Sequence, residues 1–179
     1  HFSESIIIFT SNLGVSTRDE HGRVRMNITP GNSYDEIYQI LEESIRDYFS
    51  RDLQRPELYN RIGKDNVIIF DFIRPRIANE IFEKNLASII ERVESATGVR
   101  VELAHEARET VRRHATGERE GAADDEGLLL GARGIGSALE TCLINPLARA
   151  LFALHEMPSS VTVERVVQAG AAWEVQLRC

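Results

Sequence analysis

Two short, wholly apolar runs constrain the fold of this chain more than any other feature. Residues 6–9 read IIIF, and residues 67–70 read VIIF. A run without polar residues at alternate positions is typical of a strand covered on both faces, as in the middle of a parallel sheet. We therefore predict that both runs are buried strands of one parallel sheet.

The chain between these runs predicts a loop followed by a helix. Residues 15–33 are polar and rich in turn-forming residues, as in a loop or short hairpin. From residue 34 onward, apolar residues such as Ile37 and Leu41 recur at helical spacing, and Ser33 with Glu36 forms a candidate capping box. A helix between two buried strands favours an α/β sheet.

The pattern changes near residue 74, and we predict a second domain from there. Residues 76–96 have the apolar spacing of a long helix, and residues 99–103 alternate like a half-exposed strand. A second long helix is expected from Ala132, before two strands that end the chain. The predicted fold class is thus α/β, with a partial parallel α/β sheet in residues 1–73 and a small α+β domain in residues 74–179.

The composition indicates an ordinary soluble protein and argues against some classes of partner. The 179 residues are 42% hydrophobic and 27% charged, with a formal net charge of -7, which argues against a nucleic-acid surface. No apolar run approaches the length of a membrane span and no signal peptide is visible, so we expect no membrane partner. Cys142 and Cys179 lack a metal or redox spacing, so we expect a reducing, cytoplasmic location and no metal site. Both ends look cut, as in a fragment of a longer chain.

Three polar residues occupy positions that chemistry favours. Asn12 follows the first apolar run, Arg61 precedes the second, and Arg133 opens the last long helix. Each also has an ordinary structural interpretation, because asparagine often ends a strand in a turn and surface arginines are usually solvated. Spacing alone leaves both interpretations open.

Three stretches together resemble a known family. These are SIIIFTSNLG at residues 5–14, RPELYNRIGKDNVIIF at 55–70, and LLLGARGIGSALETCLINPLARALF at 128–152. In this order they resemble the C-terminal part of a Clp-type AAA+ ATPase, the class of ring-forming unfoldases and disaggregases. The resemblance covers nearly the whole chain, from the end of the large α/β subdomain through the small lid domain.

The resemblance implies a role for each of the three residues. Asn12 matches sensor 1, which contacts the γ-phosphate or orients the attacking water. Arg61 matches the arginine finger, which reaches the nucleotide of the adjacent subunit and neutralises charge on the transferring phosphoryl group. Arg133 matches sensor 2, which contacts phosphate within its own subunit and couples nucleotide state to the angle between the domains.

Other parts of the family pattern are missing or altered. The chain contains no GxxxxGK[ST] phosphate loop and no apolar strand ending in paired acids. ATP and Mg²⁺ are therefore expected as cofactors of the parent protein, whereas this segment alone should neither bind ATP tightly nor hydrolyse it. The acidic cluster at residues 123–127 is interpreted as a solvated loop. Gly63 stands where the family more often has an acidic residue after the arginine finger. After GAR, this chain has Gly134, Ile135 and Gly136 in place of the family's usual proline and basic pair.

The resemblance implies a protein-remodelling function. The expected partners are adjacent subunits of the same protein, in a ring that is hexameric in the family, and a protein substrate. The alternative is a catalytically inactive AAA+-like assembly or protein-binding module. A remodeller of nucleic-acid complexes would need a basic surface, and the acidic composition of this segment argues against one.

Overall fold

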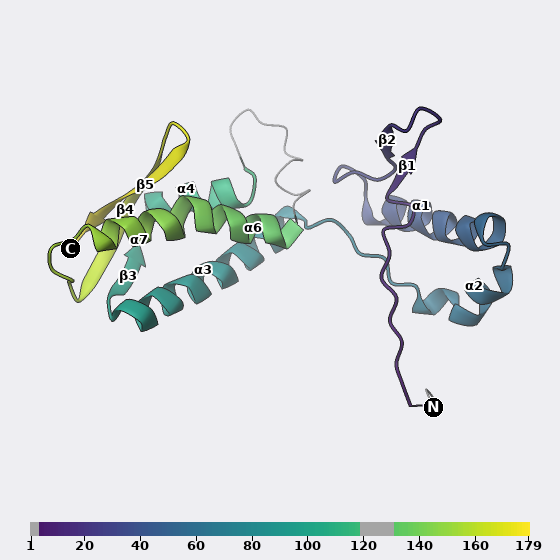
Figure 1. Cartoon of the computed structure of the whole chain (residues 1–179), viewed down its shortest axis with the longest axis horizontal. Coiled ribbons are helices and arrows are strands. Elements are labelled where there is room, and N and C mark those ends of the chain that lie inside the picture. Colours follow the sequence, from purple (N-terminus) through teal and green to yellow (C-terminus); the bar gives the residue numbers. More distant parts are fainter. Residues whose placement is uncertain (1–3, 119–130) are drawn as a thin grey trace. The chain divides into compact units, whose positions relative to one another are not determined.

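The computed structural model describes residues 4–118 and 131–179, and these residues form two compact units (Figure 1). The first unit comprises His1–Asp71, and the second comprises Phe72–Cys179. The described chain is mixed α/β, with helices in both units and a small three-stranded mixed sheet in the second.

The first unit consists of a hairpin followed by short helical segments. Strand β1 (Ser16–Arg18) pairs antiparallel with β2 (Val24–Met26), so the hairpin predicted as one option for residues 15–33 is confirmed. The remaining elements are α1 (Tyr34–Asp47), a π-helical turn η1 (Tyr48–Asp52), α2 (Pro56–Ile62) and a 3-10 turn η2 (Lys64–Asn66). The buried apolar side chains of this unit are few: Ile28, Ile37, Leu41 and Ile69.

The start of α1 confirms the capping box predicted from the sequence. The Ser33 hydroxyl accepts a hydrogen bond from the Glu36 main-chain N–H, and the Glu36 carboxylate accepts one from the Ser33 N–H at 2.8 Å. These two bonds satisfy main-chain donors that the first helical turn leaves without partners. The helix therefore begins where its sequence specifies.

The prediction of two buried parallel strands is wrong for the described residues. Residues 6–9 and 67–70 form no strand, and Ile6 and Phe70 are 91% and 83% exposed. Of these two runs, only Ile69 is buried. An apolar run becomes a buried strand only where other strands pair with both of its edges, and no described segment pairs with either run.

The second unit packs helices against a three-stranded sheet. Its helices are α3 (Pro75–Thr97), α4 (His105–Ala115), α6 (Gly131–Leu139) and α7 (Asn145–Phe152), with a π-helical turn η3 (Glu140–Ile144) joining the last two. Strand β4 (Ser160–Ala169) lies between β3 (Arg100–Leu103), which is parallel to it, and β5 (Ala172–Arg178), which is antiparallel. The long helix and the three strands predicted here are confirmed.

The core of the second unit lies between the helices and the sheet. Phe82 and Leu86 of α3 are buried in this core, and α3 packs against α6. The leucines that recur every four residues along the segment from α6 to α7 are all buried: Leu139, Leu143, Leu147 and Leu151. Trp173 of β5 is 8% exposed and belongs to the same buried cluster.

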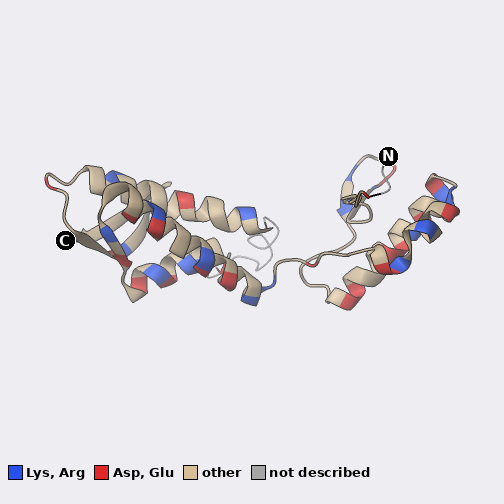
Figure 2. Cartoon of the chain, turned by 90° about the horizontal axis from the view of Figure 1, so that it is seen from below, with Lys and Arg blue, Asp and Glu red and all other residues tan. Residues whose placement is uncertain are grey.

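Charged side chains are distributed over the helices of both units rather than segregated by sign. Figure 2 shows acidic and basic residues interspersed along these helices. Pairs such as Arg46–Glu42 and Arg76–Glu80 lie four residues apart on one helix. None of the helices within the described part of the chain is both long and apolar enough to cross a bilayer.

Candidate functional site

Asn12 lies at the start of a tight turn that leads into β1. Its main-chain carbonyl accepts a hydrogen bond from the Val15 N–H at 3.2 Å, and its side chain is exposed. The Ser11 hydroxyl accepts a bond from the Leu13 N–H at 3.0 Å. The turn accounts for the polar residues after the apolar run and leaves the Asn12 amide available to a ligand.

Gly14 fixes this turn against α1. It has a φ of +81°, and a Cβ atom built on it would lie 2.5 Å from the Ser44 Cβ, so any side chain there would collide with α1. The Asn27 side-chain amide also donates a hydrogen bond to the Gly14 carbonyl oxygen at 2.8 Å. The position of Asn12 is therefore set by close packing two residues further along the chain.

Arg61 lies in the last turn of α2 and is exposed. Helix α2 begins at Pro56 and ends at Ile62, and the following Gly63, with a φ of 78°, stops the helix. Within residues 4–118 and 131–179, Arg61 forms no ion pair, whereas Arg55 at the start of the same helix pairs with Glu57 at 3.4 Å. The Arg61 guanidinium is therefore free to meet an anion from outside the described chain.

The Tyr59 side chain links α2 to α1. No residue of α2 is buried. The Tyr59 hydroxyl donates a hydrogen bond to Glu42 Oε1 at 2.9 Å, and the Tyr59 ring lies 6.0 Å from the Phe49 ring, centroid to centroid. Partial burial, and then the hydrogen bond to Glu42, raise the pKa of the Tyr59 hydroxyl. The hydroxyl thus stays protonated at neutral pH and acts as the donor.

Arg133 lies in the first turn of α6 and is exposed. Gly131, which begins this helix, is close to the start of the second unit, since a Cβ atom built on it would lie 3.9 Å from Ile73 Cδ1. Helix α6 also packs against α3. The two contacts place the first turn of α6 beside the segment through which the chain enters the second unit. No ion pair involves Arg133 in the described part of the chain.

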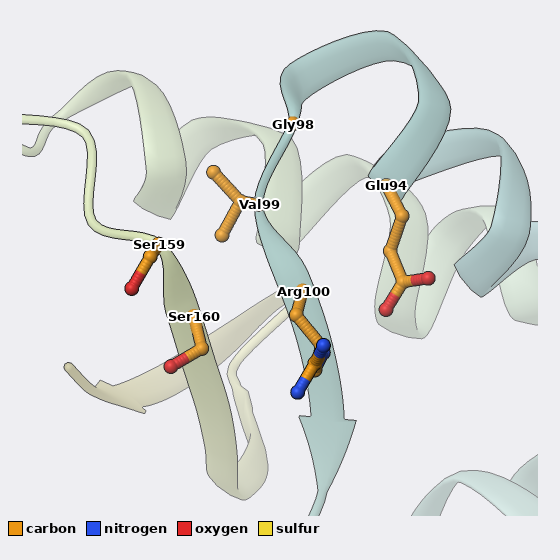
Figure 3. A pocket seen from close by; sticks show the side chains of 6 residues that line it. All are labelled: Glu94, Gly98, Val99, Arg100, Ser159 and Ser160. Atoms are coloured by element: carbon orange, nitrogen blue, oxygen red, sulfur yellow. The ribbon is translucent and has the colours of Figure 1, made fainter.

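A shallow pocket of about 360 Å³ lies elsewhere in the second unit, where α3 leads into β3 and meets β4 (Figure 3). It is lined by Glu94, Gly98, Val99, Arg100, Ser159 and Ser160. The Glu94 carboxylate already accepts a hydrogen bond from the Val101 N–H at 3.0 Å, which protects the outer edge of β3. In Figure 3 the two serine side chains point away from Glu94, so the lining groups do not converge on one ligand position.

Neither a cluster of metal ligands nor a reactive buried thiol is found among the described residues. Within residues 4–118 and 131–179, no three His, Cys, Asp or Glu side chains come together as a metal site requires. Burial raises the pKa of the Cys142 thiol to about 12, so it remains protonated and unreactive at neutral pH. The acidic cluster predicted at residues 123–127 lies outside the described residues.

The structure adds residues that the sequence did not single out. Gly14, Tyr59 and Glu42 determine how the segments carrying Asn12 and Arg61 are held. The SNLG stretch contains turn-forming residues, and this signal could have pointed to Gly14. No sequence pattern pointed to the Tyr59–Glu42 pair, because its members are 17 residues apart on different helices.

Taken together, the described residues define a two-unit α/β protein with an exposed asparagine and two exposed arginines at the ends of short structural elements. No protein-family model matches the chain, and no curated protein matches it.

Proposed function

We propose that this chain is the C-terminal part of an AAA+ ATPase module of the Clp unfoldase type, acting in a homo-oligomeric ring that remodels protein substrates. The first unit would be the end of the large subdomain and the second the lid, with a boundary near residues 73–74. The nucleotide, as ATP with Mg²⁺, would be bound mainly by the phosphate loop of the parent protein.

The observation that carries the proposal is the place of Arg133. It is an exposed arginine in the first turn of α6, and that turn lies beside Ile73 at the entry to the second unit. A residue with the sensor-2 role must contact phosphate from the lid, close to the hinge, so that nucleotide state alters the angle between subdomains. The exposed position of Arg133 in this turn supports such a role.

The chemistry of the other two residues agrees with the proposal. An exposed asparagine amide offers a donor and an acceptor, as phosphate contact and water orientation require. An arginine without an ion pair in the described chain is available to a phosphoryl group on a neighbouring subunit. The alternative, a catalytically inactive assembly module, would leave both arginines as ordinary solvated charges.

ATP turnover by the full-length protein tests the proposal. If Arg133 contacts phosphate, Arg133→Ala should weaken nucleotide binding or turnover roughly ten- to a hundredfold, as expected for loss of a charged hydrogen bond. Arg76→Ala is the matched control, because Arg76 is an exposed arginine in the first turn of α3 whose 3.0 Å partner is Glu80. Unmodified protein that neither binds nor hydrolyses ATP would favour the assembly module instead.

A further inference from the structure

We infer that the hydrogen bond between Tyr59 and Glu42 positions Arg61, so that these two residues act as a positioning pair for the arginine finger. The inference rests on the proposed function for the role of Arg61. The attachment of α2 to α1, on which the positioning depends, is observed independently.

Helix α2 needs an attachment because it has little packing of its own. It spans the seven residues Pro56–Ile62, and its apolar side chains Leu58 and Ile62 are 42% and 37% exposed. Isolated helices of this length are unstable in water. The orientation of α2 must therefore come from a small number of specific contacts with the rest of the first unit.

Tyr59 supplies the specific contact with α1. The Arg55 N–H donates a bond to the Phe49 carbonyl oxygen at 2.8 Å, which fixes only the entry to α2. At the other end, the Asn66 amide donates to the Ile62 carbonyl oxygen at 2.6 Å, a bond local to the helix end. The Tyr59 hydroxyl of α2 instead hydrogen-bonds to Glu42 on α1, and Tyr59 lies two residues before Arg61.

Glu42 is suited to hold the hydroxyl. Its side chain is only 13% exposed, and Arg46 Nη1 lies 4.0 Å from its second carboxylate oxygen. A carboxylate removed from water to this extent needs hydrogen-bond donors, and a hydrogen bond to a charged acceptor is stronger than a neutral one. The bond therefore fixes where Tyr59 of α2 lies against α1. Because Arg61 follows two residues later in the same helix, the bond also sets the direction in which α2 presents Arg61.

Exact placement matters more for an arginine finger than for a surface charge. A guanidinium stabilises a transferring phosphoryl group only when its donors lie at hydrogen-bond distance from the oxygens that gain charge. A helix that loses its side attachment would still carry Arg61 but would present it less often in that position. The expected consequence is a lower kcat with little change in the KM for ATP, because nucleotide binding does not depend on the finger.

Tyr59→Phe is the central variant, because it removes the hydroxyl and keeps the ring beside Phe49. Tyr48→Phe is the matched control: it makes the same change in the same unit, on a ring 5.9 Å from Phe49. Glu42→Ala should act like Tyr59→Phe. Glu42→Gln keeps an acceptor oxygen for the Tyr59 hydroxyl, so it should retain part of the positioning that Glu42→Ala loses.

A spin label at residue 61 tests the positioning without any need for catalysis. The label is attached to Arg61→Cys in a Cys179→Ser background, since Cys179 is exposed and Cys142 is buried. Tyr59→Phe should increase the mobility of the label, and Tyr48→Phe should leave it unchanged. Equal mobility in the unmodified and Tyr59→Phe proteins would overturn the inference.

ATP turnover of the full-length protein then tests the link to catalysis. Tyr59→Phe should lower kcat about three- to tenfold, the loss expected for one hydrogen bond, and should have no further effect in an Arg61→Ala background. A label that becomes mobile with unchanged kcat would overturn the catalytic role of the pair. Absence of turnover in the unmodified protein would overturn the proposed function, and the label would then decide the positioning alone.

Discussion

Arg149 of α7 donates a hydrogen bond from its guanidinium to the main-chain carbonyl oxygen of Trp173 on β5, at 2.9 Å. Strand β5 is an edge strand of the three-stranded sheet, so this bond ties the end of the helical segment to the sheet edge. A main-chain carbonyl at an edge would otherwise depend on water or on another chain.

Loss of this bond should destabilise the second unit. We expect Arg149→Ala to lower the free energy of unfolding by about 1 to 2 kcal/mol. Arg178→Ala, which removes an exposed ion pair with Glu164 at 3.1 Å, should cost less than about 1 kcal/mol. Urea unfolding followed by the fluorescence of Trp173, the single tryptophan, measures both. Equal losses would show that the bond to Trp173 has no special weight.

Substitution by alanine should change the free energy of unfolding very differently at two phenylalanines of the second unit. Phe82 is 0% exposed and Phe152 is 86% exposed. Phe82→Ala should cost about 3 to 5 kcal/mol, because it leaves a cavity between the helices and the sheet. Phe152→Ala should change stability by less than about 0.5 kcal/mol. A large loss for Phe152→Ala in the same urea titration would mean that another surface covers this side chain in solution.

Gly14 and Gly22 separate steric contact from backbone conformation. Both have positive φ angles, +81° and +77°, but only Gly14 would place a Cβ against Ser44. Gly22→Ala should cost about 1 to 2 kcal/mol from its left-handed backbone alone. Gly14→Ala adds overpacking, for a total of roughly 2 to 5 kcal/mol. Thermal unfolding followed by circular dichroism compares the two, and a similar loss at both sites would contradict the close packing of the turn on α1.

The capping box makes the stability of α1 depend on pH. The main-chain N–H of Ser33 donates to the Glu36 carboxylate and, together with Asn32, lowers the pKa of that group. Because the folded pKa lies below the unfolded one, the stabilisation is present above the unfolded pKa and is lost as the pH falls through the folded value. NMR titration should show Glu36 protonating at lower pH than a model glutamate, and Ser33→Ala should reduce the difference. An unshifted Glu36 would show that the box is not formed.

The sequence predicted those elements whose local signals suffice. Helix α1 had a capping box and helical spacing, and β4 and β5 were predicted as two strands joined by a glycine-containing turn. The apolar runs at 6–9 and 67–70 misled because periodicity describes the faces of a strand but not the neighbours that must pair with it. For the candidate site, the sequence singled out Asn12, Arg61 and Arg133. It could not predict the Tyr59–Glu42 pair, whose contact depends on the path of the chain between two helices.

The most direct test of the account is complementation between two variants of the full-length protein. If the proposed roles hold, Arg61→Ala removes a finger that one subunit offers to its neighbour, and Asn12→Ala removes a sensor from its own site. Each variant alone should lose most ATP turnover. Co-assembled in equal amounts, they should regain about a quarter of the unmodified rate, because that share of the interfaces in a ring pairs an intact Asn12 with an intact Arg61. A mixture as inactive as its components would contradict the trans role of Arg61, and full turnover by both single variants would contradict the proposed ATPase site.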